Sequence, residues 1–243
     1  DRKAVLHPLA LRIRPLLASA ARSSDFWAFV LAVAFFTVNL MTLGHYGMSF
    51  DEPNGMERGR KTVAFIAGLL APNASDQVSS GGFHHHPTFY ATCNYAVSEF
   101  LIRYGGWERL PAWHFLNVLT ASLGLVMLFY LGKCMFNEIV GLLSVIFMVF
   151  FPRFVAHAHY NAKDIPVMVF AVLTLLCLCL GVKHRSAKYW VLAGLSFAWS
   201  VTSKLDGLFL LVIFFAAWAL WRLSEPSDAW RSDLRCLGLF LYS

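Results

Sequence analysis

Two polar islands interrupt an otherwise apolar sequence, and their residue types are those that transfer protons and bind anions. The first contains the adjacent carboxylates Asp51 and Glu52, directly after a long apolar stretch. The second, residues 151–166, has the sequence FPRFVAHAHYNAKDIP and lies between two further apolar stretches. Charged groups and imidazoles at membrane depth are costly and by default mark function. We therefore expect both islands to contribute to one site if they lie on the same side of a membrane.

The acidic pair has two readings. Adjacent carboxylates can bind a divalent cation or supply a general base. A solvated helix end would also explain Asp51 and Glu52, and the residue types alone leave both readings open.

The second island combines basic and acidic side chains at close spacing. Arg153, His157, His159 and Lys163 precede Asp164 within a few residues. A pocket lined by such cations and imidazoles suits an anion such as phosphate. Asp164 lies at the expected start of a helix, where a carboxylate is favoured by the helix dipole. Helix capping thus accounts for Asp164 alone but not for the basic residues before it.

Lys204 is a third candidate, at the end of a later apolar stretch and two residues before Asp206. A lysine in this place can extend along the apolar surface toward water, or it can reach a phosphate. Both accounts remain open from the sequence.

The composition indicates an integral membrane protein. The chain of 243 residues is 58% hydrophobic and 14% charged, with a mean hydropathy of +0.58. Soluble domains have about 45–50% apolar and about 25% charged residues. The net charge of +6 is spread between apolar stretches, which favours a topology signal over nucleic-acid binding. The five cysteines include no CxxC spacing, so neither a zinc site nor a disulfide framework is indicated.

The apolar stretches predict an all-α fold, a polytopic transmembrane bundle of about six to seven helices. A spanning helix needs ~20 predominantly apolar residues. The stretches that meet this approximately are residues 26–46, 110–131, 140–155, 165–182, 189–203 and 208–223, with a seventh beginning near residue 234. We divide the chain into a basic arm (1–25) and a transmembrane domain (26–243).

Lysine and arginine in short loops predict the orientation, because cytoplasmic loops are enriched in them. This places the N-terminal arm in the cytoplasm, together with residues 133–137 and 183–188. The loop 47–109 and both polar islands then lie on the extracytoplasmic face. Within that loop, residues 61–70 and 87–104 have helix-like apolar patterns, and we expect them to form helices in the membrane interface.

Over roughly residues 26–223 the chain resembles the dolichyl-phosphate-mannose–protein mannosyltransferases (glycosyltransferase family 39, GT-C class). The resemblance rests on Asp51-Glu52, a His86-Pro87-aromatic element, residues 151–166 and Ser203-Lys204. Residues 151–166 are its most specific part. The resemblance implies transfer of a sugar from a polyprenyl-phosphate donor to an acceptor hydroxyl, on the extracytoplasmic face of a bacterial inner membrane or an ER membrane. Full-length members have further helices, so we interpret the chain as the N-terminal portion of a longer one.

The resemblance also implies roles for the candidate residues. Asp51 would act as the base, with Glu52 and Asp164 as further catalytic carboxylates. The groups expected to bind the phosphate or sugar are Arg153, His157, His159, Lys163 and Lys204. A divalent cation, Mg²⁺ or Mn²⁺, on Asp51 and Asp164 is the one cofactor left open. The partners would be the polyprenyl-phosphate-sugar lipid, membrane lipids and a protein or lipid acceptor.

Two other functions are compatible with such a sequence. One is a non-catalytic integral subunit of a larger membrane complex. The other is an ion or solute transporter, which predicts polar residues near the middle of the membrane. The polar residues here concentrate at one predicted face, which favours an enzyme.

Overall fold

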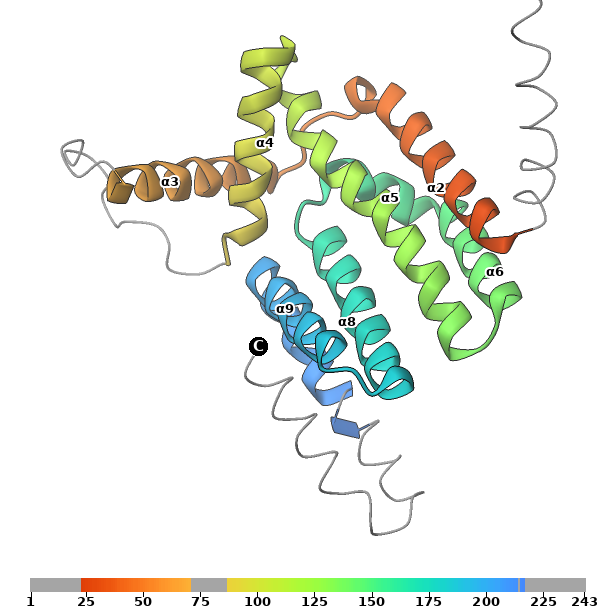
Figure 1. Cartoon of the computed structure of the whole chain (residues 1–243). Helices are drawn as coiled ribbons and strands as arrows, with labels where there is room; N and C mark the ends of the chain where they lie inside the picture. Colours follow the sequence, from red (N-terminus) through yellow and green to blue (C-terminus); the bar gives the residue numbers. More distant parts are fainter. Residues whose placement is uncertain (1–22, 71–86, 214, 217–243) are drawn as a thin grey trace, which may run out of the picture.

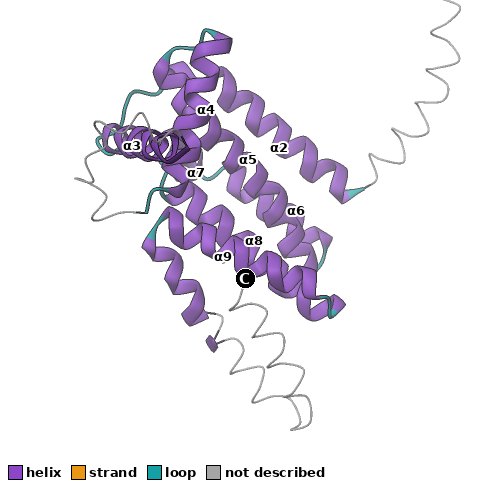
Figure 2. Cartoon of the chain, turned by 60° about the vertical axis from the view of Figure 1, so that its left-hand side comes forward, coloured by secondary structure: helices purple, strands orange, loops and turns teal. Residues whose placement is uncertain are grey.

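The computed structural model describes residues 23–70, 87–213 and 215–216, which form helices joined by turns and short loops (Figures 1 and 2). No strand occurs in these ranges, so the all-α prediction is confirmed for the described part of the chain. The basic arm up to residue 22, and the seventh helix predicted near residue 234, lie outside the described residues.

Within the described part of the chain, three helices are long and apolar enough to cross a membrane: α2 (Ser24–Met41), α5 (Arg109–Met135) and α8 (Asp164–His184). A fourth crossing results if α6 (Glu138–Val149) and α7 (Pro152–Tyr160) are counted as one bent span. A multi-pass membrane protein is therefore supported by three to four candidate spans.

The predicted total of six to seven spans is not confirmed. The helix α9 (Ala187–Ser203) has 17 residues, fewer than the ~20 that a typical crossing needs. The stretch 208–223 is described only as far as residue 216.

The single helix predicted over residues 140–155 is wrong, because the chain bends by 68° between α6 and α7. Proline explains the break. Pro152 opens α7, where its missing N–H costs nothing, and it disfavours a helical backbone at the residue before it. Phe151 accordingly has an extended conformation, with φ −79° and ψ 108°. Much of the second polar island is thus a short helix rather than a loop.

The core of the bundle surrounds α5, which packs against α2, α6 and α8. Its buried apolar residues are Ala28, Ala32, Phe35, Ala121, Leu125, Phe129, Val145, Phe154, Ala158, Ile165 and Val169. Glycines allow α5 and α6 to approach closely: a Cβ on Gly132 would lie 2.8 Å from the Cα of Gly141. Small residues at helix crossings are typical of membrane bundles, where close van der Waals packing drives association.

The helices α8 and α9 form an antiparallel pair joined by a short turn at Arg185, which has a left-handed backbone (φ 48°). A buried hydrogen bond between Thr174 and Ser196, 3.0 Å long, links the two helices. The antiparallel arrangement places the end of α9 beside the beginning of α8, and this brings Lys204 close to Asp164.

Two further helices, α3 (Glu52–Leu70) and α4 (Phe89–Gly105), lie at the same end of the bundle (Figure 1). Figure 1 shows α3 extending away from the bundle and crossing α4, which in turn packs against α5 and α9. Helices were predicted in residues 61–70 and 87–104, and both are confirmed. The acidic pair begins α3, so this helix carries the first polar island.

Candidate functional site

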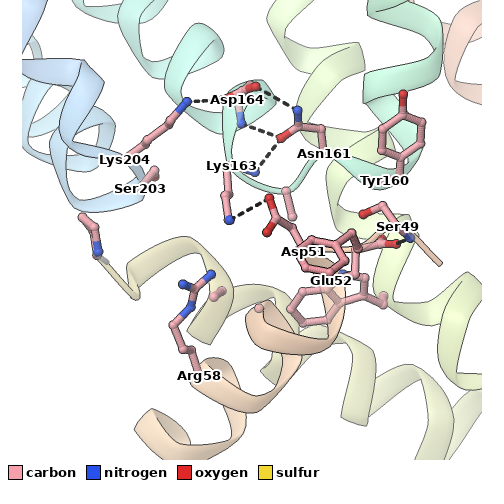
Figure 3. A pocket seen from close by; sticks show the side chains of 16 residues that line it. Ser49, Asp51, Glu52, Arg58, Tyr160, Asn161, Lys163, Asp164, Ser203 and Lys204 are labelled. Atoms are coloured by element: carbon pink, nitrogen blue, oxygen red, sulfur yellow. Dashed lines mark hydrogen bonds and ion pairs between the residues drawn. The ribbon is translucent and has the colours of Figure 1, made fainter. Parts of the chain in front are cut away.

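Both polar islands line one pocket at the end of the bundle where α3 and α4 lie. The pocket has a volume of about 360 Å³. Its walls come from the beginnings of α3, α4 and α5, the turn between α7 and α8, and the end of α9 (Figure 3). The polar residues in its lining are Ser49, Asp51, Glu52, Arg58, Tyr160, Asn161, Lys163, Asp164, Ser203 and Lys204.

Asn161 organises the turn between α7 and α8. Its side-chain oxygen accepts hydrogen bonds from the backbone N–H groups of Lys163 (3.2 Å) and Asp164 (2.9 Å). Its amide nitrogen donates to Asp164 Oδ2 at 2.8 Å. An asparagine that bonds to the backbone in this way stabilises a tight turn before a helix. The turn therefore holds Lys163 and Asp164 at the pocket in a defined orientation.

The buried side chain of Asn117 fixes the same turn to α5. Its amide nitrogen donates to the carbonyl oxygens of His157 and Ala158, both at 2.9 Å. These carbonyls belong to the last turn of α7, where helices leave acceptors unsatisfied. The end of α7 is thus attached to the central helix of the bundle.

Lys204 completes an ion-pair network on the α8 side of the pocket. Its Nζ lies 2.8 Å from Asp164 and 2.7 Å from Asp206. The hydrogen bond to Asp164 and then that to Asp206 raise the pKa of Lys204 above its ordinary value. Lys204 is therefore a stable cation in the pocket at neutral pH.

The two islands contact each other directly through Asp51 and Lys163. Their carboxylate and ammonium groups lie 3.1 Å apart, and the Asp51 side chain is 62% exposed. The prediction that the two polar islands lie close together is therefore confirmed. The catalytic role of Asp51 stays a prediction.

Glu52 differs from its neighbour in that both of its oxygens are engaged by the protein. Oε1 lies 2.7 Å from Nε2 of His114, and the two side chains are almost fully buried. Oε2 accepts a hydrogen bond from the backbone N–H of Ser49. Asp51 is consequently the member of the acidic pair that is open to the pocket, whereas Glu52 attaches the start of α3 to α5.

Three of the predicted phosphate-binding residues do not line the pocket: Arg153, His157 and His159. His159 is 1% exposed and stacks against Tyr46, with ring centroids 3.6 Å apart. The side chain of His157 accepts a hydrogen bond from Asn161. Their expected direct contact with phosphate is thus not supported by their positions.

The helical conformation of α7 separates these residues from the pocket. Arg153 is exposed in the first turn of α7, roughly 12 Å along the helix from Asn161. His159 lies at the far end but faces α2, where its Nε2 is 3.2 Å from Thr42 Oγ1. A loop would have allowed all of these side chains to converge, whereas a helix distributes them over several faces.

The structure adds three residues that were not predicted from the sequence: Arg58 and Trp113 in the pocket and His114 beside it. Arg58 follows Asp51 and Gly55 at helical spacing, which places the three on one face of α3. This periodicity could have identified Arg58. Trp113 and His114 lie within an apolar helix and carry no comparable signal.

The predicted divalent cation has no ready ligand set among the described residues. Asp51 and Asp164 each have a lysine Nζ within 3.1 Å. In the described ranges, no group of three or more His, Cys, Asp or Glu side chains could hold a metal ion. A cation on Asp51 and Asp164 would have to displace two lysines, so no catalytic step is assigned to it.

The sequence was also compared with known families. Residues 108–241, more than half of the chain, match the model of the dolichyl-phosphate-mannose-protein mannosyltransferase family. This range contains Lys163, Asp164 and Lys204, while Asp51 and Arg58 precede it. Comparisons with curated proteins and with solved structures found no match. The family match, together with apolar helices long enough to span a membrane, shows that the chain belongs to the dolichyl-phosphate-mannose-protein mannosyltransferase family of membrane glycosyltransferases.

Proposed function

We propose that the pocket is the active site for transfer of mannose from a polyprenyl-phosphate donor to an acceptor hydroxyl. The observation that carries this proposal is that Asp51, open to the pocket, shares it with Lys204 and Asp164. A carboxylate and a cation on opposite walls supply the two groups that the reaction needs. The pocket's charged residues gather at one end of the helices, which favours an enzyme over a transporter.

Asp51 serves as the general base. The acceptor hydroxyl oxygen forms a bond to the anomeric carbon of mannose, and the bond from that carbon to the phosphate oxygen breaks. The hydroxyl proton passes to Asp51, and the electron pair of the broken bond stays on the lipid phosphate. A positioned carboxylate typically contributes a factor of about 10² to 10⁴ to such a reaction.

Lys204 stabilises the phosphate leaving group. Negative charge on the lipid phosphate increases as the sugar leaves, and a fixed cation lowers the energy of that state. Lys204 is held in place by Asp164 and Asp206. Asp164 therefore orients the lysine, and Lys163 adds a second positive charge beside Asp51.

The pocket opens on the extracytoplasmic side in this proposal. The turn between α8 and α9 contains Arg185, with Lys183 in the last turn of α8 and Lys188 in the first turn of α9. It lies at the opposite end of these helices from Asp164 and Lys204. A basic turn favours the cytoplasm, which leaves the pocket on the other face. The lipid tail then lies between the apolar helices, with α3 and α4 in the membrane interface.

Replacing the base tests the proposal. Asp51→Asn should lower mannosyl transfer from dolichyl-phosphate-mannose at least about 100-fold, because an amide cannot accept the hydroxyl proton. Transfer is measured with radiolabelled donor in detergent or nanodiscs.

Glu57→Gln is the matched control, since Glu57 is an exposed carboxylate of α3 that pairs with Arg60 outside the pocket lining. It should leave transfer unchanged. An Asp51→Asn protein that folds and transfers at the parent rate would refute the role of Asp51 as base.

A further inference from the structure

The charged residues of the pocket are paired with one exception. Lys163 pairs with Asp51, and Lys204 pairs with Asp164 and Asp206. Glu52 pairs with His114. Within the described residues, Arg58 is the pocket cation for which no ion pair or hydrogen bond of the side chain is found.

Arg58 is also partly removed from solvent. Its Nε is buried and has no hydrogen-bond partner among the described residues, and its side chain is of intermediate exposure. Burial lowers the pKa of Arg58, and the charge of Asp51 counteracts that effect. A partly desolvated guanidinium without a hydrogen-bonding partner is costly. Such a group in a pocket is suited to bind an anion.

The direction of the Arg58 side chain also suits a role in anion binding. Figure 3 shows Arg58 extending from α3 into the pocket, toward the side where Lys163 and Lys204 lie. Gly55, one turn earlier on the same face, allows α3 to lie directly over Trp113: a Cβ there would be 3.2 Å from the indole ring. The floor of the pocket is thus aromatic, and Arg58 lies at its rim.

We propose that Arg58 binds the phosphate of the polyprenyl-phosphate donor, opposite Lys204. This assignment rests on the proposed function, because it assumes that the donor occupies this pocket. A guanidinium can hold two phosphate oxygens through parallel N–H groups, which an ammonium cannot do. Lys204 then supplies a point charge and Arg58 fixes the orientation of the phosphate. Arg58 takes the place that the sequence had suggested for Arg153.

Binding of dolichyl phosphate, which lacks the sugar, tests Arg58 without catalysis. Affinity is measured in nanodiscs with radiolabelled dolichyl phosphate, which has no mannose to transfer. Arg58→Gln should weaken binding roughly 10- to 100-fold, as expected for loss of a charge-assisted hydrogen bond. Arg58→Lys should restore only part of the affinity, and competition by inorganic phosphate separates headgroup from lipid contributions.

Arg60→Gln is the matched control, because Arg60 lies two residues away on α3 and pairs with Glu57 outside the pocket lining. It should bind dolichyl phosphate as the parent does. Parent-like affinity of the Arg58→Gln protein would overturn the proposal. Loss of transfer with unchanged affinity would also overturn it, since Arg58 would then act on Asp51 rather than on phosphate.

A second measurement needs no substitution at Arg58. Phenylglyoxal modifies arginine side chains, and mass spectrometry reports the modification of each one in the parent protein. Saturating dolichyl phosphate should slow modification of Arg58 several-fold and leave that of Arg60 unchanged. Equal modification of Arg58 with and without the lipid would refute the contact. Neither result depends on Asp51 being the base, so the two proposals can fail separately.

Discussion

At the scale of single residues, the acidic pair shows how two adjacent carboxylates acquire different tasks. Asp51 is open to the pocket, and Glu52 is buried against His114. Helix α3 begins between them, so their side chains leave the backbone in different directions. This buried hydrogen bond is less a source of stability than a means of fixing position, because desolvation of the two polar side chains offsets much of what the bond contributes.

Loss of the contact between Glu52 and His114 should lower the free energy of unfolding. His114→Ala leaves the Glu52 carboxylate buried without its partner, and we expect a loss of about 3–5 kcal/mol in the free energy of unfolding. Glu52→Gln alone should cost less, since an amide can still bond to His114. Denaturant unfolding in detergent measures both changes.

A double-mutant cycle separates the pair from general packing. Glu52→Gln with His114→Asn should destabilise by less than the sum of the two single changes. If the two effects simply add, the two side chains are not coupled. Transfer activity should fall in kcat rather than in the KM for the donor, because the pair positions Asp51 and does not contact the phosphate.

At the scale of helices, the crossing of α3 and α4 determines where the face bearing Asp51 and Arg58 points. The two helices meet at Gly59, whose missing side chain makes room for Ala91 and Tyr95 of α4. A Cβ at this position would lie 2.6 Å from Tyr95 Cβ and would also contact Ala91 O. The crossing therefore requires glycine for steric reasons.

Gly59→Ala should push the two helices apart and destabilise the protein by about 1–3 kcal/mol. Donor affinity should fall with it, because Arg58 is the adjacent residue. Gly68→Ala is the matched control on the same helix, since nothing lies within 4 Å of a Cβ there. Its better helix propensity should make that variant neutral or more stable. Thermal unfolding of both variants measures the difference, and equal effects would contradict the steric account.

At the scale of the whole molecule, the pocket and the basic turn lie at opposite ends of α8 and α9. The bundle around α5 holds these ends apart, and its apolar exterior suits lipid. If three to four described helices cross the membrane, the pocket and the basic turn face opposite compartments.

Cysteine labelling in sealed inverted vesicles checks this arrangement. In a chain without its native cysteines, Phe50→Cys should react with a membrane-impermeant maleimide only after the membrane is permeabilised. Arg185→Cys should react without permeabilisation. Phe50 is 94% exposed and Arg185 is also exposed, so neither thiol is hidden by the protein. Labelling of both from the same side would contradict the topology.

The sequence by itself determined the class of protein and the main acidic and basic residues of the site. Apolar stretches predicted helices, and Asp164 and Lys204 were correctly placed at the start of one helix and the end of another. These features are local, since helix propensity and apolar length depend on neighbours along the chain.

Only the tertiary structure decided which side chains meet. It brought Arg58 and the His114–Glu52 pair to the site, and it directed Arg153 and His159 elsewhere once the residues after Pro152 formed a helix. Periodicity defines the faces of a helix but not the neighbour that each face contacts. That choice depends on packing between helices distant in sequence, such as the approach of α3 over Trp113, which no local pattern records.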